Sequence, residues 1–195
     1  MRTFKQRVAS VARSERGITG LETAIILIAF VVVATVFAFV VLTTGIFSSE
    51  RGKETVFAGL AKARGTMEMR GGIVATSTGG VIDDIQFAVA TTAGGDPIPL
   101  DPAATNNRTV LAYRDETTVD NDVVYTVTPI SGDADNLLEA GELTVITINR
   151  ATGIDGPPAM AANTRFTFEV QTPVGAVLDI TRSLPVALDP VMQLH

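Results

Sequence analysis

The sequence predicts an α+β protein in which a long hydrophobic N-terminal α-helix precedes an antiparallel β-sandwich. The segment Thr23–Ser49 contains 27 residues without a charge, which is longer than the roughly 20 residues that a helix needs to cross a bilayer. After Gly71 and Gly72 the helical spacing gives way to short β-rich segments separated by turn sequences. We therefore divide the 195 residues into a segment 1–17, a helix 18–70 and a β domain 71–195.

The net charge of −6 combines two parts of opposite sign. Residues 1–17 carry five Lys or Arg and one Glu, so the rest of the chain is strongly acidic. A chain of this kind is a poor partner for nucleic acid, because phosphate binding depends on clustered Lys and Arg. Cys is absent, which excludes a disulfide framework and thiol chemistry.

The basic segment 1–17 is interpreted as a targeting segment. An ordinary secretory signal places its apolar region before the cleavage site, whereas here the cleavage-like pair Arg16-Gly17 precedes the apolar run. A cut between Gly17 and Ile18 would leave the apolar helix on the mature protein. The alternative is an uncut cytoplasmic flank of a membrane helix, because Lys and Arg favour the inner side.

The apolar pattern continues past Ser49 at helical spacing, and a helix from Ile18 to about Arg64 would be about 70 Å long. Such a rod is too long to be only a membrane anchor and too apolar to stand in water. Gly45, Gly52 and Gly59 recur every seven residues along it. They allow close helix–helix approach, allow bending, or share this spacing by chance. A short hinge is expected near Gly65–Gly72.

Glu22 is the one carboxylate near the front of the apolar run. A buried acid at a membrane boundary is costly and often functional. If Ile18 becomes the N-terminus, its ammonium lies four residues away and can pair with Glu22 of the same or a neighbouring subunit. The alternative is an acid that is favoured at a helix N-terminus by the helix dipole.

The second part of the chain predicts about seven strands in 125 residues, as in an Ig-like antiparallel sandwich. Residues Val123, Tyr125 and Val127 alternate on one face, as do Phe166, Phe168 and Val170. The expected strands are Ile73–Thr76, Val81–Thr91, Thr109–Arg114, Val123–Ile130, Leu143–Asn149, Arg165–Gln171 and Ala176–Leu184.

The parts needed for nucleophilic catalysis are missing from this composition, whereas pairs of Asp and Glu, which a two-carboxylate hydrolase would use, are present. The one histidine is the last residue, His195, so neither a Ser-His-Asp nor a Cys-His arrangement can be assembled. Phosphate-binding glycine motifs are also lacking. Surface acids usually only solvate a face, and we expect a protein that is not an enzyme.

The N-terminal region resembles that of the archaellins, the archaeal flagellins, through the segments Arg16–Ile25 (RGITGLETAI) and Ile28–Ala34 (IAFVVVA). The resemblance implies a class III, pilin-like leader that a prepilin-type peptidase removes between Gly17 and Ile18. Gly20 then lies at the third mature position and Glu22 at the fifth, as that family prefers. It also implies that the retained helix packs into the core of a filament.

The resemblance implies a structural subunit of the archaeal flagellum, which serves swimming motility. The precursor would lie in the membrane with its basic arm inside, and the mature subunit in an extracellular homopolymer turned by a separate membrane motor and assembly machinery. Two alternatives remain: a type IV-like adhesive pilin, and a single-pass membrane-anchored β domain that binds a ligand. The motif Gly20–Ile25 is more similar to archaellins than to pilins.

Four carboxylates lie between Ser131 and Glu142 and form a candidate site for Ca²⁺ or another divalent cation. From the residues alone, a solvated acidic loop is the favoured interpretation. Archaellins resemble this chain in having loops of this type that bind a divalent ion, which raises the metal interpretation to equal standing. The expected ligands are Asp133 and Asp135, followed by Glu139 and Glu142.

The sequence contains one N-x-S/T sequon, Asn107-Arg108-Thr109. In an exported chain it is a candidate N-glycosylation site. It follows the turn-like Asp101-Pro102, which suits exposure, although sequons also occur by chance. We therefore predict Asn107 as the site of a glycan.

Overall fold

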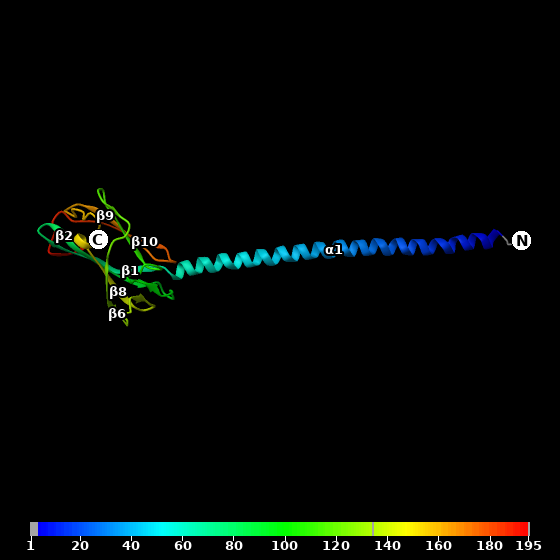
Figure 1. Ribbon diagram of the computed structural model, residues 1–195, viewed down its shortest axis with the longest axis horizontal. Helices are drawn as coiled ribbons and strands as arrows, with labels where there is room; N and C mark the ends of the chain where they lie inside the picture. The colour runs from blue at the N-terminus through cyan, green and yellow to red at the C-terminus, as the bar shows by residue number, and fades with distance from the viewer. Residues whose placement is uncertain (1–3, 134, 195) are drawn as a thin grey trace. The chain divides into compact units, whose positions relative to one another are not determined.

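The computed structural model describes residues 4–133 and 135–194, with side chains described from Gly20 onward. The chain divides into two compact units, Met1–Val56 and Phe57–His195. Helix α1 (Phe4–Arg64) supplies the first unit and continues into the second, and all strands belong to the second unit. Figure 1 labels α1 and the principal strands.

Helix α1 ends at Arg64, where the apolar spacing predicted, and not at residue 70 as the segment bounds 18–70 implied; it also begins before Ile18, at Phe4. The helix extends back to Phe4 because more than half of the residues in the preceding segment, among them three Arg and two Ala, are good helix formers. It ends at Arg64 because Gly65 follows at the position where helices commonly stop. The uncharged run Thr23–Ser49 is helical throughout, as predicted.

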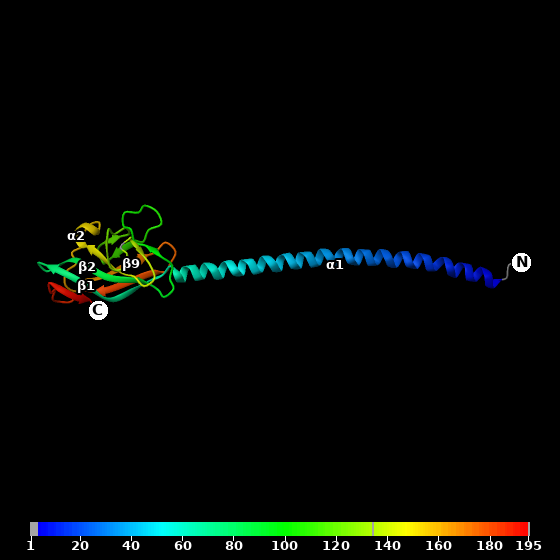
Figure 2. The ribbon, with the colours of Figure 1, turned by 90° about the horizontal axis from the view of Figure 1, so that it is seen from below.

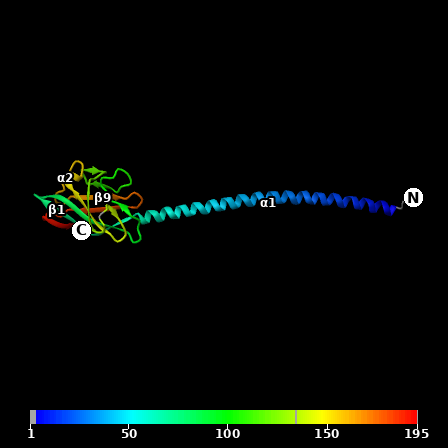
Figure 3. The same cartoon turned by 60° about the horizontal axis from the view of Figure 1, so that its bottom comes forward.

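The larger sheet has five antiparallel strands in the order β11-β1-β2-β8-β6. Strand β11, drawn in red, lies beside β1 in Figures 2 and 3. The strands are β1 (Met67–Thr78), β2 (Val81–Thr91), β6 (Thr126–Ser131), β8 (Leu143–Asn149) and β11 (Val191–Leu194). The one-turn helix α2 (Arg150–Gly153) follows β8 and is capped by Asn149, whose side chain accepts from the amides of Ala151 and Thr152.

The smaller sheet has four antiparallel strands in the order β10-β9-β4-β5. A short two-stranded ladder joins β3 to β7. The strands of these two sheets are β4 (Val110–Arg114), β5 (Val119–Asp120), β9 (Arg165–Gln171), β10 (Val177–Ser183), β3 (Ile98–Pro99) and β7 (Leu137–Leu138).

The two main sheets pack face to face and enclose the core. The ring of Phe87 on β2 lies 6.5 Å from the ring of Phe168 on β9, and Tyr113 on β4 lies 5.3 Å from Phe168. These aromatic side chains are buried together with aliphatic residues from both sheets. The predicted antiparallel sandwich is confirmed, and Phe166, Phe168 and Val170 point into its core as the alternation predicted.

Three predicted strands match the observed bounds: Val81–Thr91, Leu143–Asn149 and Arg165–Gln171. The prediction that Gly71 and Gly72 end the helical segment is wrong. They lie inside β1, at a register shift between Arg70 and Val74, where Gly71 has φ 83°. Glycine allows this left-handed conformation at a bulge.

Strands β3, β5, β7 and β11 were not predicted. The first three are only two residues long, too short for an alternating pattern to be recognised. Strand β11 follows Pro190 in a segment that reads as a loop, and its place is set by pairing with β1. The predicted strand Val123–Ile130 starts later, at Thr126, although Val123 and Tyr125 are buried.

Candidate assembly surface

The uncharged part of helix α1, Thr23–Ser49, presents an apolar surface on all sides. Every residue from Gly20 to Leu60 is exposed in the isolated chain. Large side chains are included, with 73% of Phe30 and 70% of Phe37 exposed. The described part of this helix, Gly20–Arg64, is long and apolar enough to span a membrane.

A helix that is hydrophobic on all faces is normally buried in a large core or a membrane. Burying a single Leu, Ile, Val or Phe side chain is worth about 1.5–3 kcal/mol. The exposed large side chains between Leu21 and Phe47 therefore represent a driving force on the order of tens of kcal/mol per chain. This surface requires lipid or other protein helices around it.

The three heptad-spaced glycines leave open space on this surface. A Cβ atom added at Gly45, Gly52 or Gly59 would meet no atom of the chain within 4 Å. Glycine at these positions is therefore not required by contacts within the subunit. The same holds for Gly20, and Glu22 lies exposed on the helix near it.

The expected cleavage site is formed by Arg16, Gly17 and Ile18. Their backbone lies within α1, but their side chains are outside the described residues. His195 is likewise outside the described residues.

After the uncharged run, charges return to the helix at Glu50, and one local ion pair forms there. Arg51 donates to Glu54 over 3.0 Å, and its guanidinium lies 5.2 Å from the ring centroid of Phe47. Earlier in the helix the hydroxyls of Thr35 and Thr44 donate to carbonyls of the preceding turn. These contacts hold polar groups against the helix and leave its apolar faces free for other chains.

The acidic loop after β6 is held by its own carboxylates. Glu142 accepts from the amide of Asp133 over 3.2 Å and from the amide of Glu139 over 2.9 Å. Asp135 accepts from the amide of Leu137 over 2.8 Å. Among residues 20–133 and 135–194, whose side chains the structure describes, three or more His, Cys, Asp or Glu side chains do not come together as a metal-binding group. The four predicted ligands thus do not form a preassembled cation site.

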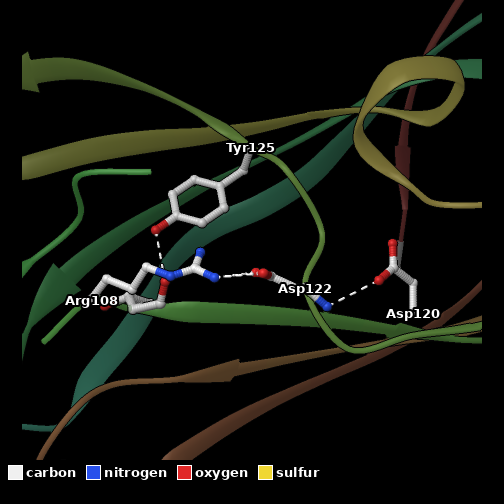
Figure 4. Close-up of polar contacts among 5 residues, drawn as sticks. Arg108, Asp120, Asp122 and Tyr125 are labelled. Carbon is white, nitrogen blue, oxygen red and sulfur yellow. Dashed lines mark hydrogen bonds and ion pairs between the residues drawn. The ribbon is translucent and has the colours of Figure 1, made fainter. Parts of the chain in front are cut away.

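The sequon lies in the loop between β3 and β4, and Asn107 is exposed with φ 51°. The following residue, Arg108, donates to both carboxylate oxygens of Asp122 over 2.5 and 2.6 Å (Figure 4). This hydrogen bond with Asp122 raises the pKa of Arg108 above its ordinary value. The Thr109 hydroxyl is buried and donates to the Pro99 carbonyl over 2.8 Å.

Tyr125 and Asp120 complete this polar network. The Tyr125 hydroxyl donates to the Thr109 carbonyl over 2.9 Å, and burial raises the pKa of Tyr125 to about 12. Asp120 accepts from the amide of Asp122 over 3.0 Å (Figure 4) and from the amide of Asp155 over 2.7 Å. Sequence analysis missed this network, because its members are separated by up to 47 residues and no local pattern joins them.

The comparisons with known proteins agree over most of the chain. The sequence profile of the family "Archaeal-type flagellin" matches residues 17–182. Probable flagellin 1 of Archaeoglobus fulgidus is 36% identical over 202 residues, which cover 93% of this chain and 96% of the relative. Probable flagellin 1 of Aeropyrum pernix is 29% identical over 90% of this chain and 95% of the relative.

Solved structures give the same result. The archaeal flagellum of Methanospirillum hungatei strain JF1 is similar with a TM-score of 0.62 and 28% identity, over 90% of this chain and 98% of that chain. The crystal structure of archaeal flagellin FlaB1 from Methanocaldococcus jannaschii, with 16% identity and a TM-score of 0.54, shares the fold over 66% of this chain and 95% of that chain.

These matches extend over both the apolar helix and the β-sandwich. The family is structural, so the expectation of a protein that is not an enzyme is confirmed. Of the three functions considered from the sequence, the filament subunit is the one supported, with its β domain and helix outside the cell in the assembled flagellum. The chain belongs to the archaeal-type flagellin family and is a structural subunit of the archaeal flagellum.

Proposed function

We propose that this subunit is made as a membrane-inserted precursor and that a prepilin-type peptidase cuts it between Gly17 and Ile18. The observation that carries the proposal is the exposed apolar surface of Thr23–Ser49, which closely follows a basic segment. The start of the family match at residue 17 supports the same boundary. After cleavage the helix leaves the lipid and enters a core made of helices from other subunits.

The N-terminus of filament protein tests this proposal directly. Mass spectrometry of purified filaments is expected to find Ile18 as the first residue. A matched sample from cells without the peptidase should retain the basic segment and remain in the membrane fraction. Filament protein that still begins at Met1 would overturn the proposal and favour a permanently anchored β domain.

The assembly contact follows from the apolar helix. Each subunit uses its helix against different surfaces of several neighbours, and a contact of this heterologous kind gives an open helical filament. The space at Gly45, Gly52 and Gly59 then receives side chains of neighbouring helices. Gly52→Leu is expected to prevent assembly, whereas Thr43→Leu, on the opposite side from Gly45, is the control for added bulk. Normal filaments from Gly52→Leu would show that the glycine spacing is incidental.

Glu22 is proposed to pair with the ammonium of Ile18 on a neighbouring subunit. An acid inside an apolar filament core needs such a partner, because an unpaired buried charge costs several kcal/mol. Glu22→Ala is expected to impair assembly while membrane insertion of the precursor stays normal. Normal filament yield from this variant would reduce Glu22 to a residue that favours the start of the mature helix.

The motor and assembly machinery remain proposed partners. The filament itself carries no catalytic group, so rotation must be supplied at its membrane end. Swimming of cells that produce this subunit as their one flagellin is the measurement that tests the proposal. Filaments that support only attachment would instead favour the adhesive alternative.

Asn107 is proposed to carry an N-linked glycan. Exposure of Asn107 supports this, whereas the Thr109 hydroxyl, which a transferase must reach, is buried against Pro99. We infer that the glycan is attached before this loop folds. Mass spectrometry of native filaments should find a glycopeptide that Asn107→Gln abolishes, and enzymatic glycosylation of refolded protein should be much slower than that of the unfolded chain.

Binding of Ca²⁺ or another divalent cation by the loop after β6 also remains a proposal. The loop's own hydrogen bonds already engage Glu142 and Asp135, so any cation would have to recruit further carboxylate oxygens. Calorimetric titration with Ca²⁺, with Asp133→Asn as the control, tests it. If the titration releases no heat and Ca²⁺ does not shift the unfolding temperature, the loop does not bind this cation.

A further inference from the structure

The connection between α1 and β1 consists of two residues, Gly65 and Thr66. Both are fastened to another loop of the same compact unit. The Gly65 carbonyl accepts from the buried Thr172 hydroxyl over 3.0 Å. The Thr66 hydroxyl donates to the Lys62 carbonyl over 2.9 Å and accepts from the Ala176 amide over 3.1 Å. The loop Thr172–Ala176 therefore holds both connecting residues.

A second loop holds the last residue of the helix. The Arg64 carbonyl, which has no partner within the helix, accepts from the Asp96 amide over 2.9 Å. The Arg64 guanidinium lies 2.7 Å from the Asp96 carboxylate and donates to the Gly94 carbonyl over 3.3 Å. In addition, the Thr92 amide donates to the Thr66 carbonyl over 3.3 Å. The helix end is thus bonded from two sides.

Close packing accompanies these hydrogen bonds. A Cβ atom added at Gly175 would lie 2.0 Å from the Gly65 carbonyl oxygen and 2.3 Å from the Thr172 hydroxyl. One added at Gly95 would lie 2.8 Å from the Arg64 carbonyl oxygen. Only glycine fits at these two positions, because any side chain would push the loops away from the end of the helix.

We propose that this junction is a rigid coupling that transmits load between the filament core and the outer β domain, with Arg64, Thr66, Thr172 and Gly175 as its positioning residues. The inference rests on the role of the chain as a filament subunit. The hinge expected near Gly65–Gly72 is replaced by a bonded joint inside the unit Phe57–His195.

Hydrogen exchange of the full chain in assembled filaments tests the coupling. The amides of Thr92, Asp96 and Ala176, each a donor to the junction, should exchange about as slowly as that of Ile146 in strand β8, which is paired on both sides. A hinge would instead let them exchange at the rate of the exposed loop residue Thr105, on the order of 100-fold faster or more. Exchange at that faster rate would overturn the proposal.

Two substitutions measure the contribution of the positioning residues. Thr172→Val keeps the side-chain shape but removes the bonds to Gly65 and to the Gly175 amide. Exchange at Asp96 and Ala176 should become at least about 10-fold faster, with Ile146 unchanged. Thr78→Val, on an exposed strand residue, is the matched control and should change none of these amides. Gly175→Ala should have a larger effect than Thr172→Val.

Electron microscopy of the same filaments provides the second readout. In Thr172→Val filaments the helical core should stay ordered while the outer domains lose definition. Unchanged exchange and equally sharp outer domains in both variants would refute the coupling. If Gly175→Ala unfolds the sheets, the Ile146 amide will also exchange quickly. In that case the test of the coupling rests on Thr172→Val alone. Failure of the wild-type chain to form filaments would contradict the proposed function and not the coupling, because exchange can also be measured on the detergent-solubilised full chain.

Discussion

The helix α1 and the β domain use apolar side chains in opposite ways. Phe30 in the helix is 73% exposed, whereas Phe168 in the β domain is fully buried. The β domain folds around its own core of residues from two sheets, but the helix before Phe57 has only other molecules to cover it. The domain is therefore a self-sufficient folding unit, and the helix is a surface that becomes stable only in lipid or in the filament.

This difference predicts that a charge in the helix abolishes assembly without unfolding the β domain. Val36→Asp places a carboxylate among neighbouring apolar helices, at a cost of several kcal/mol for each subunit. We expect loss of sedimentable filaments with an unchanged thermal transition of the β domain. Val124→Asp, at an exposed position of the domain, is the control. Filaments in normal amounts from Val36→Asp would disprove the assignment of the apolar surface.

A substitution in the core of the β domain should weaken the domain and leave the surface of the helix unchanged. Phe168→Ala removes a ring that contacts Phe87, Tyr113 and Phe166. The cavity should lower the free energy of unfolding of the domain by about 3–5 kcal/mol, measured by denaturant unfolding of the full chain in detergent. Val186→Ala, at an exposed position, should change it by less than about 0.5 kcal/mol. Equal effects of the two substitutions would contradict the described core.

A smaller effect is expected in the acidic loop. Gly132 has φ 139°, and Gly132→Ala would bring a Cβ to 2.2 Å from a Glu142 carboxylate oxygen, displacing the carboxylate that bonds the Asp133 and Glu139 amides. We expect a loss of about 1–3 kcal/mol in domain stability. Gly141→Ala tests backbone strain alone, because its φ is 91° and an added Cβ meets nothing within 4 Å. Equal losses in both variants would show that the Glu142 contacts contribute little.

The smallest predicted effect is the pH dependence of the turn after β4. Burial by itself raises the pKa of Asp115, but hydrogen bonds from Tyr113 and from the Thr117 and Thr118 amides outweigh it and lower the pKa below its ordinary value. A lowered pKa means that ionised Asp115 stabilises the fold above the unfolded-state value of about 3.9. That contribution is lost as the pH falls through the folded-state value.

Thermal unfolding of the wild-type chain and of Asp115→Asn between pH 7 and pH 2 checks this sign. The two transition temperatures should converge at acid pH, and the wild type should be the more stable form at neutral pH. Glu116→Gln, at the exposed neighbouring residue, is the matched control. A difference between wild type and Asp115→Asn that does not change with pH would contradict the role given to the carboxylate.

The accuracy of the predictions followed the type of pattern in the sequence. Strands with strict alternation, such as Arg165–Gln171, were predicted to the residue. In such a strand every second side chain is apolar, because one face of the strand is buried. The prediction at Gly71 and Gly72 was wrong because glycine is common both at a bulge inside a strand and at the end of a helix. The Glu142 contacts could not be predicted, since a cation site and a self-bonded loop contain the same acids.

The sequence by itself determined the long apolar helix, the basic segment before it, the sandwich class and the family, because each depends on composition, period or a local motif. The tertiary structure alone decided the bulge in β1, the network around Arg108 and the bonded joint at Gly65. Those features depend on residues far apart in the chain, such as Gly65 and Thr172, that meet only after the sheets have formed.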